Sequence, residues 1–221
     1  MEPPSILATL WQSRLALLQG LEVTLGIAAA AILLGAAIGV VLALVAVFAP
    51  RPFRLLVAAY VYVLRGTPLL VTLFFIYFGL AVAWRALPAG GAATLALSLF
   101  AGAYMTEIFR GAIQAIPHAQ LDAAKAIGLP FLSRVRRVIA PLAIRRAIPS
   151  LTNVSVEMVK ASALVSALGI GDLLLSGQQI AMRTLLIPET YLFLWLVYFL
   201  INAGLTTLGR RCEEHYRHVV F

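Results

Sequence analysis

Long apolar runs separated by short polar gaps dominate the chain. A membrane-spanning helix needs about 20 consecutive, mostly apolar residues. Five runs approach or exceed this length, and they cover residues 21–48, 55–84, 92–108, 148–175 and 191–209. Pro50 and Pro52 end the first run, because proline fixes φ and has no N–H to continue a helix. The pattern predicts an all-α polytopic membrane protein with five transmembrane helices.

The second run is too long for one straight span perpendicular to the membrane, since a helix rises about 1.5 Å per residue. It contains the sequence Arg65-Gly66-Thr67-Pro68, in which a glycine and a proline interrupt the apolar pattern. We therefore expect this segment to bend or restart around Pro68, near the inner membrane surface.

Composition supports a membrane protein and excludes two other classes. The chain is 62% hydrophobic and 12% charged, whereas soluble domains are about half apolar and about a quarter charged. So much apolar surface argues against a water-soluble enzyme, and disordered chains are poor in apolar residues. The net charge of +8 would suggest nucleic acid as a partner of a soluble chain, but here the basic residues lie between apolar runs, so we expect none.

The basic residues also predict the orientation. With five spans, 13 of the 17 Lys and Arg fall on one side, and Lys160 lies within the fourth run. The other side receives only Arg14, Arg85 and Arg183. Because the side rich in Lys and Arg is cytoplasmic, we expect the N-terminus outside and the C-terminus in the cytoplasm.

The chain reads as one transmembrane domain, residues 21–209, with a flanking segment at each end. Residues 1–20 lie outside, and 5–19 could form an interfacial amphipathic helix anchored by Trp11. Residues 113–147 form a cytoplasmic loop, and 210–221 form a cytoplasmic tail. We see no internal repeat and no cleavable signal peptide.

The cytoplasmic loop contains a short helix pattern, and we call residues 117–130 the knob. Gly128 lies where this helix would end, and glycine tolerates the left-handed conformation that such ends often adopt. Ala123 and Ala124 form a patch slim enough to fit a groove on another protein. A second, basic amphipathic segment follows and ends at Pro141. Alternatively, the knob and the basic segment after it lie on anionic lipid headgroups, held by the arginines of that segment.

The spacing of residues in this loop resembles the EAA loop of ABC importer permeases. In that family the pattern begins Glu-Ala-Ala, reaches a glycine at this spacing and ends Ile-x-Leu-Pro. The matching positions here are Asp122, Ala123, Ala124, Gly128, Val138, Ala140 and Pro141. The chain departs from the pattern by carrying Asp122 for Glu, Val138 for Ile and Ala140 for Leu.

Three further segments extend the resemblance to roughly residues 20–208. Residues 64–79 resemble the second-span signature of the polar amino acid branch, whose motif here consists of Arg65, Gly66, Thr67 and Pro68. Residues 103–111 resemble that branch's third-span end, and 160–165 resemble its Lys-Asp-Thr-Ser-Leu stretch. The resemblance implies the type I ABC importer permease fold and an amino acid permease subunit.

The resemblance also implies partners in a bacterial cytoplasmic (inner) membrane. These are two ABC ATPase subunits, a second permease chain, identical or homologous, and an extracytoplasmic solute-binding protein. The ATPase-coupling residues would be Gln120, Asp122, Ala123, Ala124, Gly128, Val138 and Pro141. The sequence contains no Gly-x4-Gly-Lys-Ser/Thr, the loop that cradles nucleotide phosphates. We therefore expect no enzyme activity and no bound cofactor in this chain, and we expect ATP and Mg to be used by the ATPase.

Polar residues within the apolar runs mark a candidate translocation path: Asn153, Glu157, Lys160, Ser162 and Asp172. The first three share a helical face, and Glu157 and Lys160 can pair at i,i+3. Intramembrane ionisable residues are rare and usually functional. Alternatively, Glu157 and Lys160 form a structural pair near the interface, with Lys160 snorkelling. Asp172 could mark a gate or a site for a substrate ammonium group, or it could cap a helix.

Three other patterns have simple interpretations. Glu107 and Arg110 form an i,i+3 pair at the end of the third run. Ala31, Gly35 and Gly39 form a small-residue stripe that permits close helix contact, either within the chain or with a second chain. The C-terminal Cys and His residues lie in a short tail, and we expect no metal site there.

Two alternatives to an ABC permease stay open at this point. The chain could be a subunit of an ion-coupled secondary transporter, a class that often shows inverted repeats and broken helices. It could also be a membrane scaffold that transports nothing.

Overall fold

The computed structural model describes residues 6–83 and 86–217, and every regular element in this part of the chain is a helix. The elements in chain order are α1 (Ile6–Gln12), α2 (Arg14–Phe48), α3 (Arg51–Gly66), α4 (Leu69–Phe74), the π-helical segment η1 (Phe75–Gly79), α5 (Leu80–Ala83), α6 (Ala89–Gln114), α7 (His118–Ala126), α8 (Phe131–Arg134), the π-helical segment η2 (Val135–Ile139), α9 (Ala140–Ala161), the 3₁₀ segment η3 (Ser162–Leu168), α10 (Leu173–Thr184) and α11 (Ile187–Arg217).

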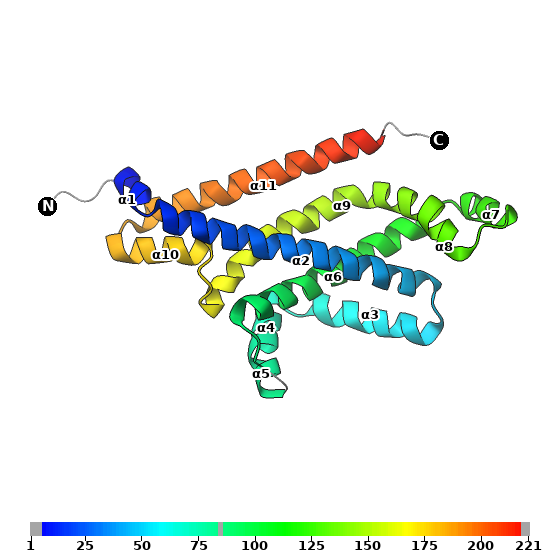
Figure 1. Cartoon of the computed structure of the whole chain (residues 1–221), viewed down its shortest axis with the longest axis horizontal. Helices are drawn as coiled ribbons and strands as arrows, with labels where there is room; N and C mark the ends of the chain where they lie inside the picture. The colour runs from blue at the N-terminus through cyan, green and yellow to red at the C-terminus, as the bar shows by residue number, and fades with distance from the viewer. Residues whose placement is uncertain (1–5, 84–85, 218–221) are drawn as a thin grey trace.

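The long helices lie along one axis of an elongated bundle (Figure 1). Helices α2, α6 and α11 are each long and apolar enough to cross a membrane. Two bent pairs complete the set, α3 with residues 69–82 and 131–168 with α10, which gives five spans if each pair counts as one. The fold is therefore the all-α polytopic bundle that the sequence predicts.

Helices α2 and α6 form the most extensive helix pair among the described residues, and they pack closely. A Cβ added to Gly35 would lie 2.6 Å from the Ala101 Cβ, and one added to Gly39 would lie 2.7 Å from the Met105 Cβ. Ala31 is also fully buried. The small-residue stripe thus packs inside this chain, so it is not the seam with a second chain.

The chain bends by 109° between α3 and α4, around the predicted position. Thr67 leaves the helix with extended backbone, and its hydroxyl donates to the Val63 carbonyl at 2.9 Å. The predicted location of this bend near the inner surface is wrong. Helix α3 spans 16 residues, or about 24 Å, before the bend, and the hydroxyl of Tyr60 reaches the Leu99 carbonyl in the first half of α6. The bend therefore lies partway through the bundle.

The predicted fourth span, residues 148–175, is wrong at both ends. The helix already begins at Phe131 and continues to Leu168, and α10 follows after a bend of 56°. Gly169 ends the first part with a φ of +74°, which glycine adopts without a Cβ clash. The prediction that the basic segment ends at Pro141 is also wrong, because the helix continues through this residue. Pro141 lies at the start of α9, where a missing N–H breaks no α-helical bond.

The interfacial helix is shorter than predicted. It spans only α1, and α2 begins at Arg14, so residues 14–19 belong to the first span; Ser5 lies outside the described residues. Arg14 donates to the Trp11 carbonyl at 2.7 Å, and its guanidinium lies 4.6 Å from the Trp11 ring centroid. This pair fixes the corner between α1 and α2.

Candidate coupling and translocation sites

Helix α7 ends in a compact glycine cap. The N–H of Gly128 donates to the Lys125 carbonyl at 2.9 Å, and the N–H of Leu129 donates to the Ala124 carbonyl at 3.2 Å. These two bonds satisfy carbonyls that a helix end otherwise leaves free, and they require a left-handed residue at the cap. Gly128 has a φ of +73°, which confirms the predicted glycine-capped end of the helix.

One face of α7 packs against the bundle and the other is exposed. Ala124 is only 5% exposed, and Leu121 packs beside it against the cluster that contains Ile113 and Ile116. The predicted exposed patch is therefore wrong for Ala124 and holds for Ala123, which is exposed together with Gln120. The exposed surface of the knob that a partner could contact therefore has one small residue, Ala123, at its centre.

An ion pair lies at the exposed face of α7. Lys125 Nζ donates to Asp122 Oδ1 at 2.9 Å, and both side chains are largely exposed. This hydrogen bond, with the charge of Lys125, lowers the pKa of Asp122 below its usual value. Asp122 is therefore a carboxylate at neutral pH and stays accessible to a partner.

The second half of the EAA-like pattern lies away from α7. Val138 is in η2, where it is partly buried, and Pro141 is exposed at the start of α9. These residues therefore belong to the helix that leads from the knob into the bundle.

Two grooves meet at Tyr104, halfway along α6. The first, about 440 Å³, lies between α3 and α6 and is lined by Ala58, Val61, Tyr62, Arg65, Gly66, Tyr104 and Glu107. The second, about 330 Å³, lies between α6 and α9 and is lined by Phe100, Tyr104, Asn153, Val154, Glu157 and Met158. Because Tyr104 lines both grooves, they are neighbours: each is mainly apolar and is lined by a few polar and charged side chains.

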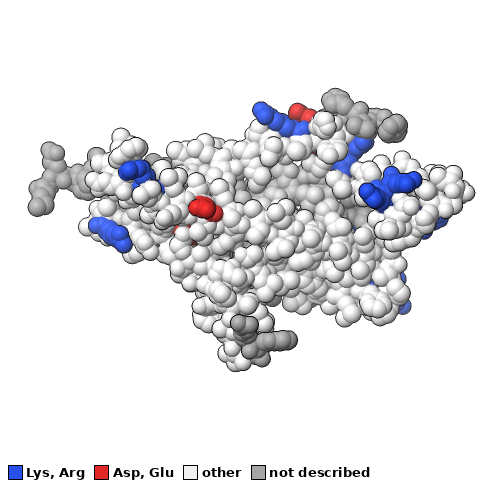
Figure 2. Space-filling view, in the orientation of Figure 1, with Lys and Arg blue, Asp and Glu red and all other residues white. Residues whose placement is uncertain are grey.

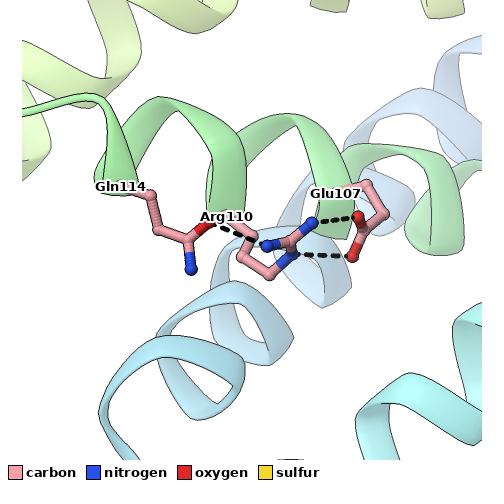
Figure 3. Close-up of polar contacts among 3 residues, drawn as sticks. All are labelled: Glu107, Arg110 and Gln114. Atoms are coloured by element: carbon pink, nitrogen blue, oxygen red, sulfur yellow. Dashed lines mark hydrogen bonds and ion pairs between the residues drawn. The ribbon is translucent and has the colours of Figure 1, made fainter.

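The first groove contains a cation and an anion held by different partners. The Arg65 guanidinium lies 4.9 Å from the Tyr104 ring centroid, a cation–π distance. Glu107 accepts two hydrogen bonds from Arg110, at 2.9 and 2.5 Å, and Arg110 also donates to Gln114 at 2.8 Å (Figure 3). The predicted Glu107–Arg110 pair is confirmed, and the Arg65 side chain lines the same groove.

The second groove contains two of the three residues predicted to share a face of the fourth span, Asn153 and Glu157, and Lys160 lines a separate pocket beside α11. Lys160 Nζ lies 2.8 Å from Glu157 Oε2, and the two side chains are 54% and 59% exposed. Asn153, one turn before Glu157, is exposed as well. The structure thus places Asn153, Glu157 and Lys160 together on an accessible face.

Ser162 and Asp172 do not join that face, since both are fully buried. Ser162 donates to the Val159 carbonyl at 2.8 Å. Asp172 caps α10 by accepting the Leu175 N–H at 2.8 Å, as the cap interpretation predicts. The two residues hold the η3–α10 corner in place, and a solute in the grooves cannot reach them in this conformation.

Tyr104 is the residue that sequence reasoning missed. It falls within residues 103–111, which carry the family resemblance, but a single tyrosine in an apolar run gives no signal of its own. Only the packing of α3 and α9 on opposite sides of α6 places it between two grooves. As for metals, the described residues contain no group of three or more His, Cys, Asp or Glu that could hold an ion; His218 lies outside them.

Charge separates the two ends of the bundle. In Figure 2, Lys and Arg gather towards the end that carries α7 and α8, a few lie at the α1 and α10 end, and most of the surface between is uncharged apart from an acidic side chain. A helical bundle with an apolar middle, a few charged side chains in grooves at mid-length and a small exposed helix at one end is consistent with a membrane transport subunit, since ionisable residues within membrane helices are usually functional.

Comparison with known proteins gives the family. A family model described as a binding-protein-dependent transport system inner membrane component matches residues 31–218. The chain belongs to this family, and it is a permease subunit of an ABC transporter.

The relatives agree in length and in kind. The arginine transport system permease protein ArtQ of Bacillus subtilis is 33% identical over 90% of this chain and 91% of its own length. The putative glutamine transport system permease protein GlnP of Rickettsia bellii is 35% identical over the same shares. The L-cystine transport system permease protein TcyB of Bacillus subtilis is 33% identical over 80% of each chain.

Solved structures share the fold. A crystal structure of an amino acid ABC transporter with histidines matches 96% of this chain and 99% of its own, with a TM-score of 0.86 and 32% identity. An inward-facing structure of the methionine ABC transporter MetNI matches 91% and 96%, with a TM-score of 0.78 and 22% identity. The second likeness is one of fold alone.

Proposed function

We propose that this chain forms the translocation path of an ATP-driven amino acid importer in a bacterial cytoplasmic membrane. The family match over residues 31–218 carries this proposal. Relatives of similar length are named for arginine, glutamine and cystine transport, and a structural neighbour is described with histidines. The shared chemistry of these solutes is the zwitterionic amino acid backbone.

The two grooves at Tyr104 form the path in this proposal. Arg65 offers a cation in one groove, and Glu157 offers an anion in the other. A zwitterion that lies across Tyr104 can present its carboxylate to Arg65 and its ammonium group to Glu157. Lys160 holds Glu157 in position by their 2.8 Å contact. Both grooves are open on this chain alone, and a second permease chain, identical or homologous, closes them.

The knob is the docking point for the ATPase. It lies at the end of the bundle where Lys and Arg gather, which is the cytoplasmic end by the positive-inside rule. The N-terminus is then outside, and the C-terminus is cytoplasmic. Ala123 enters a groove on one of two ATPase subunits, which bind and hydrolyse ATP with Mg, and Gln120, Asp122 and Gly128 shape the contact. A solute-binding protein delivers the amino acid at the α1 and α10 end.

Reconstitution tests the transport proposal. The permease, its ATPase and its solute-binding protein are placed in proteoliposomes with an equimolar mixture of labelled arginine, glutamine, histidine and cystine. We expect uptake of at least one of them that requires ATP and persists when ion gradients are collapsed. Uptake driven by an ion gradient without ATP would instead indicate a secondary transporter.

Crosslinking tests the docking proposal. In a Cys212→Ser background, Ala123→Cys should crosslink to the ATPase. The matched control is Met182→Cys, which is 68% exposed at the opposite end of the bundle and should give no such product. Crosslinking at Met182 but not at Ala123 would invert the proposed orientation.

A further inference from the structure

Movement of α7 can reach the bundle by three routes: through residues 115–117 to α6, through the packing of Leu121 on the cluster that contains Ile113 and Ile116, and through the segment that follows α7. Helix α7 packs on α8 and η2, and the Gly128 cap leaves a connection of just four residues, 127–130. A force on the knob is therefore delivered both to α6 and to residues 131–139.

The direct continuation into α9 runs through a widened helical turn. In η2 the backbone bonds skip to the fifth residue, so that the Ala140 N–H donates to the Val135 carbonyl. Such π segments interrupt the regular ladder and are places where helices bend. We expect η2 to bend when α8 rotates, so that only part of the rotation reaches α9.

A second contact bypasses η2. Phe131, the first residue of α8, packs its ring edge-to-face on Phe48, with centroids 5.2 Å apart and an interplanar angle of 77°. The guanidinium carbon of Arg134 lies 5.9 Å from the centroid of the Phe131 ring. Phe48 is the last residue of α2, and α3 begins three residues later. The ring pair therefore joins α8, which directly follows the knob, to the corner between α2 and α3.

This aromatic pair lies at the surface. Phe131 is 47% exposed and Phe48 is 40% exposed. Truncating either ring leaves no cavity in a core, so the contact contributes little to the packing of the bundle. The pair nevertheless connects α8, which follows the knob, to the end of α2, the longest helix.

We propose that the Phe48–Phe131 pair is a second coupling contact, through which movement of the knob reaches α2 directly. The proposal rests on the docking of the ATPase at α7. Helix α2 lies against α6 without room for a methyl group at Gly35 or Gly39, so the two helices respond together. A push at Phe48 is then transmitted along the whole bundle instead of being lost in η2.

The test measures uptake of the labelled amino acid mixture per ATP hydrolysed in proteoliposomes that contain the whole transporter. Phe131→Leu and Phe48→Leu keep apolar bulk but remove the ring contact. Each should lower this ratio by about three- to tenfold, the range expected for losing an aromatic pair. The double variant should be no worse than either single variant, since both remove the same contact. Phe131→Tyr keeps the ring contact and should show the wild-type ratio.

Leu132→Ala is the matched control, because Leu132 is 76% exposed on the same short helix; it should leave the ratio unchanged. A wild-type ratio in Phe131→Leu, or additive losses in the double variant, would overturn the proposal. Failure of Phe131→Leu alone to retain the ATPase would also overturn it, since Phe131 would then contact the ATPase and not act through Phe48. If Ala123→Cys gives no crosslink to the ATPase in a chain with both Phe48 and Phe131 intact, docking at α7 itself is contradicted. The docking proposal and the aromatic-pair proposal therefore fail in different experiments.

Discussion

The hydroxyl oxygen of Thr24 accepts the backbone N–H of Leu173 at 3.0 Å, joining two residues that are 149 positions apart in the sequence. Thr24 is fully buried, and Leu173 is the first residue of α10. The first N–H groups of a helix have no partner inside it. The contact therefore supplies an acceptor from α2 to the start of α10, beside the cap that Asp172 provides.

Replacing Thr24 should destabilise the bundle. Thr24→Val keeps the shape of the side chain but leaves the buried Leu173 N–H unpaired, which costs about 1–3 kcal/mol. Thr24→Ser should retain the acceptor. The measurement is the thermal unfolding midpoint in detergent. Thr190→Val is the control, because the buried Thr190 hydroxyl donates to the carbonyl of Leu186, four residues earlier in the chain, and joins no distant segment. Equal effects of the two valine variants would contradict the assigned role.

Two glycines of the same helix should respond in opposite ways to alanine. Gly35→Ala places a Cβ 2.6 Å from Ala101, and overpacking of this kind costs about 1–3 kcal/mol. Gly26→Ala meets no atom within 4 Å and should be neutral or slightly stabilising, because alanine favours helix. Unfolding midpoints of the two variants measure the difference. A tolerant Gly35→Ala would mean that α2 and α6 lie further apart than observed.

The turn that ends α7 should not accept a branched residue. Gly128→Val forces a β-branched side chain into a φ of +73°, where an L-residue pays about 1–2 kcal/mol or more. We expect the variant to insert normally but to retain about 5- to 30-fold less ATPase in pull-down, the equivalent of that energy. Gly111→Val has equally free space and an ordinary helical φ, so it should retain the ATPase. Wild-type retention by Gly128→Val would separate the cap from docking.

The acidic group in the second groove should matter for uptake and not for insertion. Glu157→Gln keeps the size of the side chain but removes the charge offered to an ammonium group. Charge-assisted hydrogen bonds contribute about 1.5–3 kcal/mol, so uptake at low solute concentration should fall by about 10- to 100-fold. Glu189→Gln, on an exposed residue at the start of α11, is the control and should leave uptake unchanged. Unaltered uptake by Glu157→Gln would remove this face from the path.

Local chemistry made part of the fold predictable. The bend at Thr67–Pro68, the left-handed Gly128, the cap at Asp172 and the two i,i+3 ion pairs each depend on a few neighbouring residues, and each is present. The Ala31–Gly39 stripe shows the limit of this reasoning. Sequence indicates that something packs closely there, but only the folded chain shows that the partner is α6.

The errors arose where packing overrides local signals. Pro149 lies inside α9, yet the helix continues, because neighbouring helices and side chains in a membrane bundle re-satisfy the freed backbone groups. Hydropathy also could not separate α10 from the span before it, since apolar residues run on through the break at Gly169. The role of Tyr104 depends on two helices that arrive from distant parts of the chain.

The close approach of α2 and α6 has a mechanical consequence. Two helices that interlock without space for a single methyl group cannot rotate past each other unless they first separate. They therefore move together as one rigid pair, and movement within the subunit must come from parts that pack less closely. The segment α4–α5, which leans away from the bundle beyond a 109° bend, is such a part.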